Sequence, residues 1–266
     1  MKAAGFLGCL GVEALKVRRT MALALAVLLP AAVVGMFVIY LLQNPFSVPR
    51  ESGLTPASLI IQGLLTFWSV LVLPIFAAIE TSLLASLEHQ SRGWKHLFAL
   101  PPARGALIAA KFAGAVLLIA IAHAFLFGFT LVLLWAMPKL RPGLGLEAPV
   151  PFLAILVVFA VCAVSSLFIV GVHTLISLRW PSFALNIGIA LAGMLCVFVV
   201  MDTRANRFYP WSQPGATLNV VVPWIFHWPD VKADPGDLVA LLAIVAGGFL
   251  VTAFGGGWLL ARRDVF

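Results

Sequence analysis

The sequence predicts an all-α integral membrane protein with six transmembrane helices. Of its 266 residues, 62% are hydrophobic and only 10% are charged, which is far from the composition of a soluble domain. The apolar residues fall in long runs, and a spanning helix needs roughly 20 of them. Six such runs with short connections account for the chain, so a separate soluble catalytic domain is not expected.

The basic residues predict the orientation of the chain. The net charge is +7, and the lysines and arginines cluster beside the ends of the apolar runs, as the positive-inside rule describes. We therefore interpret the positive charge as a signal of membrane orientation and expect no nucleic-acid partner. Both termini are predicted to be cytoplasmic, together with these basic residues: Lys2, Lys16, Arg18, Arg19, Arg92, Lys95, Arg104, Lys111, Arg179, Arg262 and Arg263.

The chain is expected to form one transmembrane domain, residues 1–266. Its first residues are partly apolar and end in basic residues, which favours an elbow helix lying along the cytoplasmic interface. Pro74 is an expected kink in the second span. In chain order, the predicted elements are the elbow helix at 3–19, spans at 21–42 and 57–84, an inner loop at 86–104, spans at 106–135, 151–176 and 183–200, an outer segment at 202–236, and a span at 238–260.

No enzyme motif is present. The sequence lacks G-x-x-x-x-G-K-[ST], G-x-S-x-G and H-E-x-x-H, so we expect no catalytic, cofactor-binding or metal-binding residues in this chain. Cys9, Cys162 and Cys196 are widely spaced in apolar sequence, which favours packing roles. If ATP powers this protein, another polypeptide must bind it.

Three ionisable residues lie within predicted spans. Glu80 is the most costly, because a carboxylate near the centre of a bilayer costs about 2.5 to 3.5 kcal/mol on insertion scales. Either an interhelical hydrogen bond or a contact that changes during a transport cycle would account for it. His123 and His173 are better explained as neutral side chains bonded to neighbouring helices, with a functional role as the alternative.

The inner loop contains a short amphipathic helix. Trp94, Leu97 and Phe98 fall at i, i+3 and i+4 and so share one face, while Lys95 and His96 face away. A Pro-Pro pair at 101–102 ends this helix. From this pattern alone, the short helix is better explained as an anchor at the membrane interface than as a docking site for a partner protein.

The region from residue 80 to residue 111 has a particular order of acidic, aromatic, basic and proline residues. These are Glu80, Glu88, Trp94, Lys95, Leu97, Ala99, Leu100, Pro101, Ala103, Arg104, Leu107, Ile108, Ala110 and Lys111. Together with the short stretches VEALKVRRT near the start and RRDV near the end, this pattern resembles the ABC-2 type permeases, and in particular their lantibiotic-immunity branch, which exports antimicrobial peptides.

The resemblance implies a coupling helix between the second and third spans that docks on a separate ATP-binding subunit. The residues it assigns to coupling are Glu88, Arg92, Trp94, Lys95, His96, Leu97 and Phe98. It also implies short re-entrant helices in the outer segment. Candidate translocation or gating residues are Glu80, His123, His173, Trp211, Trp224 and Trp228, although an aromatic belt would equally explain the tryptophans.

The resemblance further implies partners and a location. We expect two copies of an ATPase that carries ATP and Mg²⁺, a second permease chain that is identical or related, the lipid bilayer, and an amphipathic peptide as cargo. The expected location is a bacterial cytoplasmic (inner) membrane. Alternatives are a permease for a drug, lipid or polysaccharide, a non-transporting anchor or sensor subunit, and an intramembrane enzyme that uses Glu80, His123 and His173. A proton-coupled carrier is disfavoured because so few buried acids are available.

Overall fold

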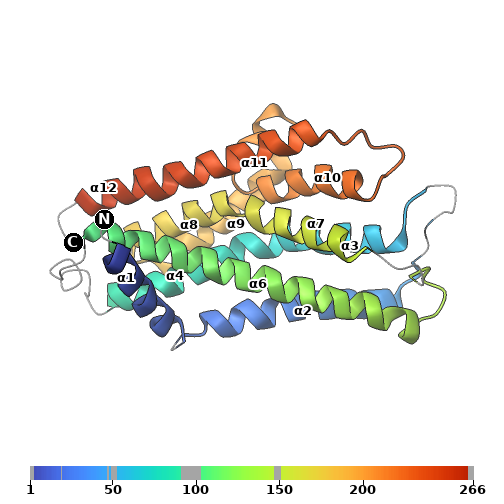
Figure 1. The fold of residues 1–266 in the computed structure, drawn as a ribbon, viewed down its shortest axis with the longest axis horizontal. Coiled ribbons are helices and arrows are strands. Elements are labelled where there is room, and N and C mark those ends of the chain that lie inside the picture. The colour runs from blue at the N-terminus through green and yellow to red at the C-terminus, as the bar shows by residue number, and fades with distance from the viewer. Residues whose placement is uncertain are drawn as a thin grey trace.

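The described part of the chain is a bundle of long helices (Figure 1). This computed structural model describes residues 3–18, 20–46, 48, 53–90, 103–146 and 151–262. All of its elements are helical, which confirms the predicted all-α class. In chain order they are α1 (Ala3–Val17), α2 (Ala22–Gln43), α3 (Pro56–Phe67), η2 (Trp68–Val72), α4 (Leu73–Gln90), α6 (Arg104–Leu140), α7 (Phe152–Ser165), α8 (Leu167–Arg179), α9 (Phe183–Val200), η3 (Arg204–Arg207), α10 (Gln213–Ile225), α11 (Pro235–Leu250), η4 (Val251–Gly256) and α12 (Gly257–Arg262).

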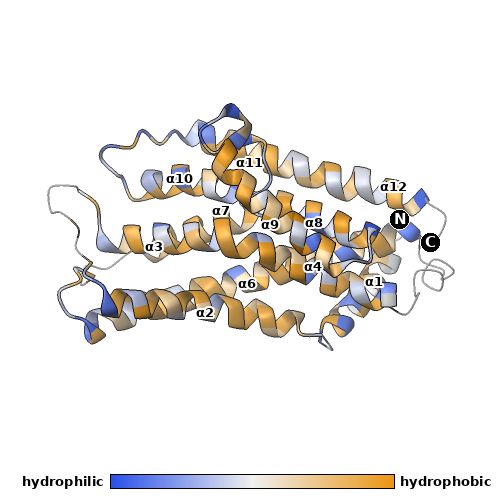
Figure 2. Cartoon of the chain, turned by 180° about the vertical axis from the view of Figure 1, so that it is seen from behind, coloured by the Kyte–Doolittle hydropathy of each residue, from blue (hydrophilic) through white to orange (hydrophobic). Residues whose placement is uncertain are grey.

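Among the described residues, six helical stretches are long and apolar enough to cross a membrane, which confirms the predicted number of spans. Figure 2 shows apolar residues along their length and polar residues mainly toward the two ends of the bundle. The stretches are Ala22–Gln43, Pro56–His89, Arg104–Leu140, Phe152–Arg179, Phe183–Val200 and Pro235–Arg262.

The two ends of the bundle differ in what they hold. One end, which we call the proximal end, holds α1, the last turn of α4, the start of α6 and all of α12 (Figure 1). Here α1 packs against α6 and α4. The opposite end, the distal end, holds the end of α2, the start of α3, the end of α6 and the start of α7 (Figure 1).

Two spans contain local irregularities that have causes in the sequence. Pro74 has no backbone N–H, and its ring conflicts with the carbonyl four residues earlier, at Val70. Val70 lies in the π-helical segment η2, whose wider turn accommodates this conflict. Between α7 and α8, the Ser166 hydroxyl donates to the backbone oxygen of Ala163 at 2.6 Å, a contact that typically bends helices.

The third span is longer than the sequence indicates. α6 has 37 residues and continues beyond residue 135 to Leu140, so it measures about 55 Å against a hydrocarbon core of roughly 30 Å. Beyond its end, Arg141 donates hydrogen bonds to the backbone oxygens of Leu41 and, at 2.7 Å, of Asn44. The arginine therefore satisfies carbonyls at the end of α2 and ties the distal ends of α2 and α6 together.

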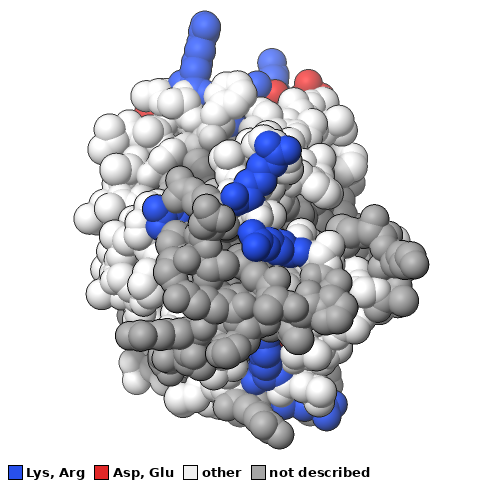
Figure 3. Space-filling view, turned by 90° about the vertical axis from the view of Figure 1, so that its left-hand side faces the viewer, with Lys and Arg blue, Asp and Glu red and all other residues white. Residues whose placement is uncertain are grey.

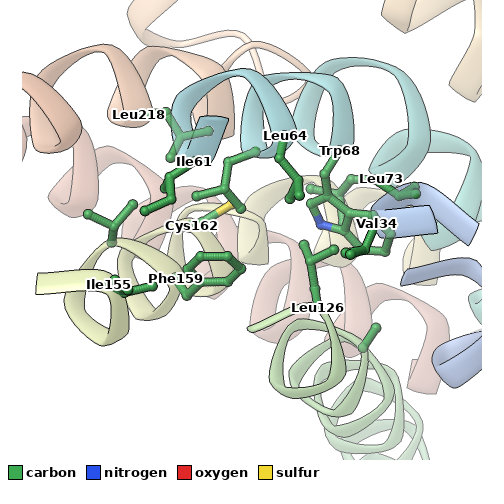
Figure 4. Close-up of a cluster of buried hydrophobic side chains, with 14 of the residues drawn as sticks. Val34, Ile61, Leu64, Trp68, Leu73, Leu126, Ile155, Phe159, Cys162 and Leu218 are labelled. Carbon is green, nitrogen blue, oxygen red and sulfur yellow. The ribbon is translucent and has the colours of Figure 1, made fainter. Parts of the chain in front are cut away.

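Figure 4 shows part of the apolar core, where buried side chains from several helices meet. Trp68 is fully buried and packs with Leu64 from the same span, Leu126 from α6 and Phe159 from α7. Leu218 of α10 belongs to the same cluster, so the segment after the fifth span also contributes to the core. This packing holds the spans in the arrangement in which their polar side chains meet.

Candidate functional site

Four charged side chains form a closed ring at the proximal end of the bundle. Lys16 Nζ lies 2.8 Å from Glu13 Oε1 and 2.6 Å from Glu88 Oε1. Lys111 Nζ lies 2.7 Å from Glu13 Oε2 and 2.7 Å from Glu88 Oε2. Each lysine therefore contacts both carboxylates, and the charges of the ring sum to zero. We call these four residues the charged ring.

The charged ring is largely hidden from solvent. Glu13, Glu88 and Lys111 are 6%, 3% and 2% exposed, respectively. Lys111 also donates to the backbone oxygen of Leu84 at 2.5 Å. Buried ions are tolerated when they are paired and hydrogen-bonded. Removal of one member would therefore leave its partners as unpaired buried charges.

Lys16 lies in α1, outside the six spans, and stays charged. Burial lowers the pKa of its ammonium group, but hydrogen bonds and charge interactions with Glu13 and Glu88 raise this pKa further than burial lowers it. The net pKa is above the ordinary lysine value, so Lys16 is a cation at neutral pH.

The ring joins three elements around the inner loop. Glu13 and Lys16 come from α1, Glu88 from the last turns of α4, and Lys111 from the first turns of α6. The segment that connects α4 to α6 is the loop predicted to hold the coupling helix. Of its predicted coupling residues, Glu88 belongs to the ring, and the others lie outside the described residues: Arg92, Trp94, Lys95, His96, Leu97 and Phe98.

The ring was not foreseen from the sequence, although two signals pointed to it. Glu13 and Lys16 are spaced i, i+3, which places them side by side on a helix. Lys111 lies within an otherwise apolar helix, where an ionisable group needs a partner. The sequence did not predict that Lys16 and Lys111 meet the same two acids, because one sequence does not show which helices pack together.

A second polar cluster lies deeper in the bundle, where α4, α8 and α9 meet. The Asn186 amide nitrogen donates to the backbone oxygen of Ala78 at 3.0 Å and to Ser82 Oγ at 2.9 Å, and it lies 3.1 Å from Thr81 Oγ1. The amide oxygen accepts from His173 Nδ1 at 2.7 Å. Asn186 is therefore the residue that links three spans.

Residues that follow the fifth span reach back to this cluster. The Trp211 ring lies edge-on to His173, with 5.6 Å between centroids. It also covers Gly193, where a Cβ atom would lie 2.3 Å from the indole, so only glycine fits there. The Tyr209 hydroxyl donates to the backbone oxygen of Gly193 at 2.9 Å. Because Gly193 is two turns before the end of α9, this segment penetrates between the helices.

Hydrogen bonds to both ring nitrogens hold His123 in the core. Its Nδ1 lies 2.8 Å from the backbone oxygen of Ile119, which can only accept, so Nδ1 carries the proton. Its Nε2 accepts from Trp68 Nε1 at 3.2 Å. His123 is therefore a neutral side chain that is hydrogen-bonded to a neighbouring span through Trp68, as expected from the sequence. Within the described part of the chain, Glu80, His123 and His173 form no hydrogen bonds with one another, which argues against a joint catalytic site.

Glu80 is buried without a hydrogen-bond partner among the described residues. It is 1% exposed, and both carboxyl oxygens lack a partner there. Glu80, Leu84 and Glu88 recur every four residues on α4 and so share one face. A carboxyl group in such a place is costly, whatever its protonation state. It is therefore a candidate for a contact made in another conformation or with a transported molecule.

The three candidate tryptophans occupy different environments. Trp211 packs inside the bundle, as described above. Trp228 donates to Ser58 Oγ at 3.2 Å and so joins the end of the outer segment to the start of α3. Trp224, in the last turn of α10, is 39% exposed. Trp224 and Trp228 have the partial exposure of interfacial aromatic residues, and the gating role of the three tryptophans stays a prediction.

The described residues contain no group of three or more histidine, cysteine or acidic side chains placed to hold a metal ion. The cysteines are all free: Cys9 and Cys162 are buried, and Cys196 is exposed. Cys162 Sγ lies 3.3 Å from Ser69 Oγ within the core.

Replacing Asn186 with leucine is expected to destabilise the bundle by about 2 kcal/mol. Four polar contacts are lost, and each is worth about 0.6 kcal/mol on average within a membrane protein. Thermal unfolding of the purified protein in detergent measures the effect. Asn219→Leu is the matched control, because Asn219 is exposed and accepts one hydrogen bond, from Gln62. Equal losses in the two variants would show that Asn186 does not link the spans.

Comparison with known proteins gave one match. Residues 9–200 match the model of a family described as ABC-2 family transporter protein. This range includes the charged ring, the Asn186 cluster and the first five spans. No curated protein and no solved structure matches the chain.

Proposed function

Because the chain belongs to the ABC-2 family of transporter proteins, and is therefore a membrane permease subunit and not the ATPase, we propose that it is the permease of an ATP-driven exporter. Membership of this family implies an ABC ATP-binding partner subunit. In the proposed complex, two copies of that subunit bind ATP and Mg²⁺. Two permease chains, identical or related, form the transport pathway between them.

The charged ring is the observation that best supports a coupling role. It fixes the last turns of α4 and the first turns of α6 to one another and to α1. Any force applied to the loop between α4 and α6 is thus passed to three elements at once. Ions buried in pairs resist separation, because separation leaves unpaired charges in a nonpolar place. The ring therefore makes the proximal end of these helices move as one body.

In this proposal the proximal end faces the cytoplasm of a bacterial cell, at its cytoplasmic membrane. The excess of lysine and arginine predicted on that side supports this orientation. α1 then serves as the interfacial elbow helix, and the loop at 91–102 docks on the ATPase through its amphipathic face. ATP binding does work on the permease only to the extent that the ATPase prefers one of two arrangements of the loop.

Combined replacement of Trp94 and Phe98 with alanine is expected to abolish export while membrane insertion is retained. The two side chains share one face of the predicted loop helix, and truncation of both removes the apolar contact with the ATPase. ATPase activity of the purified complex, with and without cargo, and export from loaded vesicles measure the effect. We expect ATP hydrolysis to lose its response to cargo.

The matched control for that variant is Trp135→Ala combined with Phe152→Ala. These aromatic residues are 66% and 58% exposed, and they lie near the distal end of the bundle. Export should be unchanged in the control. Normal export in the Trp94 and Phe98 variant would exclude the loop as the coupling part.

We propose an amphipathic antimicrobial peptide, such as a lantibiotic, as the cargo, which would give resistance or immunity. The resemblance of the 80–111 region to peptide exporters supports this class. The segment from Tyr209 into α10 is then a re-entrant element at the outer side, since Trp211 reaches His173 inside the bundle. Tolerance of cells with and without the transporter, across a panel of peptides, drugs and lipid-like compounds, tests the cargo. Protection against drugs alone would favour a different substrate.

A further inference from the structure

An apolar groove runs along the outside of the bundle from its proximal end. It has a volume of about 900 Å³ and lies between α6, η4 and α12, with α1 at its edge. The side chains that line it are all apolar. They extend from Gly105 to Val116 along α6, a rise of about 17 Å. That is close to half of a hydrocarbon core of roughly 30 Å, so the groove spans the depth of one leaflet.

The backbone itself shapes the groove. η4 is a π-helical segment within the sixth span, and π-helical turns inside longer helices are frequent at functional sites. Small residues form much of the lining, including Ala109 and Ala113 on α6 and Ala253 and Gly255 on η4. Trp258 provides part of the wall and is 53% exposed. The small side chains leave the space of the groove unfilled, and the Trp258 ring forms one of its walls.

The proximal mouth of the groove carries two positive charges. Arg104 directly precedes Gly105, is exposed, and donates to the backbone oxygen of Ala261 at 3.4 Å. Arg262 directly follows Ala261, and its guanidinium lies 3.8 Å from the centroid of the Trp258 ring. Both Ala261 and Trp258 line the groove. Figure 3 views the molecule from its proximal end and shows lysine and arginine side chains at several places on the visible surface.

No acidic residue is among the described residues that line this groove. An apolar slot one leaflet deep, with a guanidinium pair and an indole at its mouth, complements a molecule with an alkyl chain and an anionic head. Basic pockets between transmembrane helices bind such head groups, and tryptophan commonly lies at that level of the membrane.

We propose that this groove is a binding site for an anionic phospholipid. One acyl chain lies between α6 and η4, and the phosphate contacts Arg104 and Arg262. The lipid thereby joins the start of the third span to the end of the sixth. The site is separate from the charged ring and from the polar cluster at Asn186, and it does not depend on which cargo is transported.

Native mass spectrometry of the purified transporter tests this proposal with phosphatidylglycerol and phosphatidylcholine of the same acyl chains. We expect one site per permease chain that binds phosphatidylglycerol about tenfold more tightly, since each arginine near an anionic head contributes to binding. Arg104→Gln combined with Arg262→Gln should abolish the preference for the anionic head. The matched control, Arg179→Gln, removes a positive charge at the proximal end of α8 and should leave the preference intact.

A second pair of variants tests the groove itself. Gly255→Leu is expected to lower the occupancy of both lipids about tenfold or more, because a Cβ atom at Gly255 meets nothing within 4 Å and the side chain extends into the groove. Gly247→Leu is the control, since a Cβ atom there is equally free of contacts but Gly247 does not line the groove.

Three results would overturn the proposal. The first is equal binding of the two lipids, and the second is a preference that survives loss of both arginines. The third is a Gly255→Leu variant that leaves lipid occupancy unchanged while the number of permease chains per complex falls. That last outcome would show that another protein chain fills the groove.

Discussion

Replacing Lys111 with methionine is expected to destabilise the folded protein by about 3 to 5 kcal/mol. Methionine has a similar length and keeps the packing, but it leaves the carboxylates of Glu13 and Glu88 facing one another without this cation. Lys16 still contacts both acids, but a single cation does not balance two buried carboxylates. Unfolding of the purified protein in a bilayer mimetic measures the loss.

The exposed pair of Arg207 and Asp237 provides the control. Arg207 Nη2 lies 3.0 Å from Asp237 Oδ1, but the two side chains are 56% and 44% exposed. Arg207→Met is therefore expected to cost no more than about 1 kcal/mol. Adding Glu88→Gln to Lys111→Met should restore part of the stability, because it removes one unpaired charge. If Lys111→Met costs no more than Arg207→Met, the ring does not hold the proximal end together.

Replacing Glu80 with leucine is expected to act in the opposite direction and to stabilise the protein by about 1 to 3 kcal/mol. The carboxyl oxygens of Glu80 have no hydrogen-bond partner in the described chain. The substitution therefore breaks no hydrogen bond there and removes the free-energy cost of burying the carboxyl group. If this carboxyl group contacts cargo or moves during transport, the same variant loses export. The prediction is thus a more stable protein with less activity, measured by unfolding and by export.

Glu88→Leu is the matched control, because it makes the same change two turns further along α4. Glu88 holds both lysines of the ring, so this variant should lose stability. A loss of stability in Glu80→Leu as well would show that Glu80 has a partner in the folded state. Its interpretation as a residue of the transport cycle would then fail.

Much of the fold could be predicted from the sequence because hydropathy acts locally. Twenty apolar residues in a row determine a span whatever its neighbours, so the number of spans followed from runs of residues. The length of α6 did not follow, because its last turns depend on Arg141, which bonds to carbonyls of α2 about a hundred residues earlier. Such a contact leaves no mark in local composition.

The candidate site could be predicted only in part, for the same reason. Glu80, His123 and His173 stood out because ionisable groups are rare in apolar runs. Their environments did not follow from the sequence. The structure gives both histidines hydrogen-bond partners, whereas Glu80 has none among the described residues. Asn186 was missed because an uncharged amide does not interrupt hydropathy, although it makes more interhelical bonds than either histidine.

The central claim is that this chain is a permease driven by a separate ATPase through the loop that the charged ring supports. The most direct measurement is a mild-detergent purification of the chain from native membranes, with mass spectrometry of its partners and a vanadate-sensitive ATPase assay of the product. We predict a co-purifying subunit with a P-loop, which is lost when Trp94 and Phe98 are replaced with alanine. A clean purification with no nucleotide-binding partner would contradict the claim.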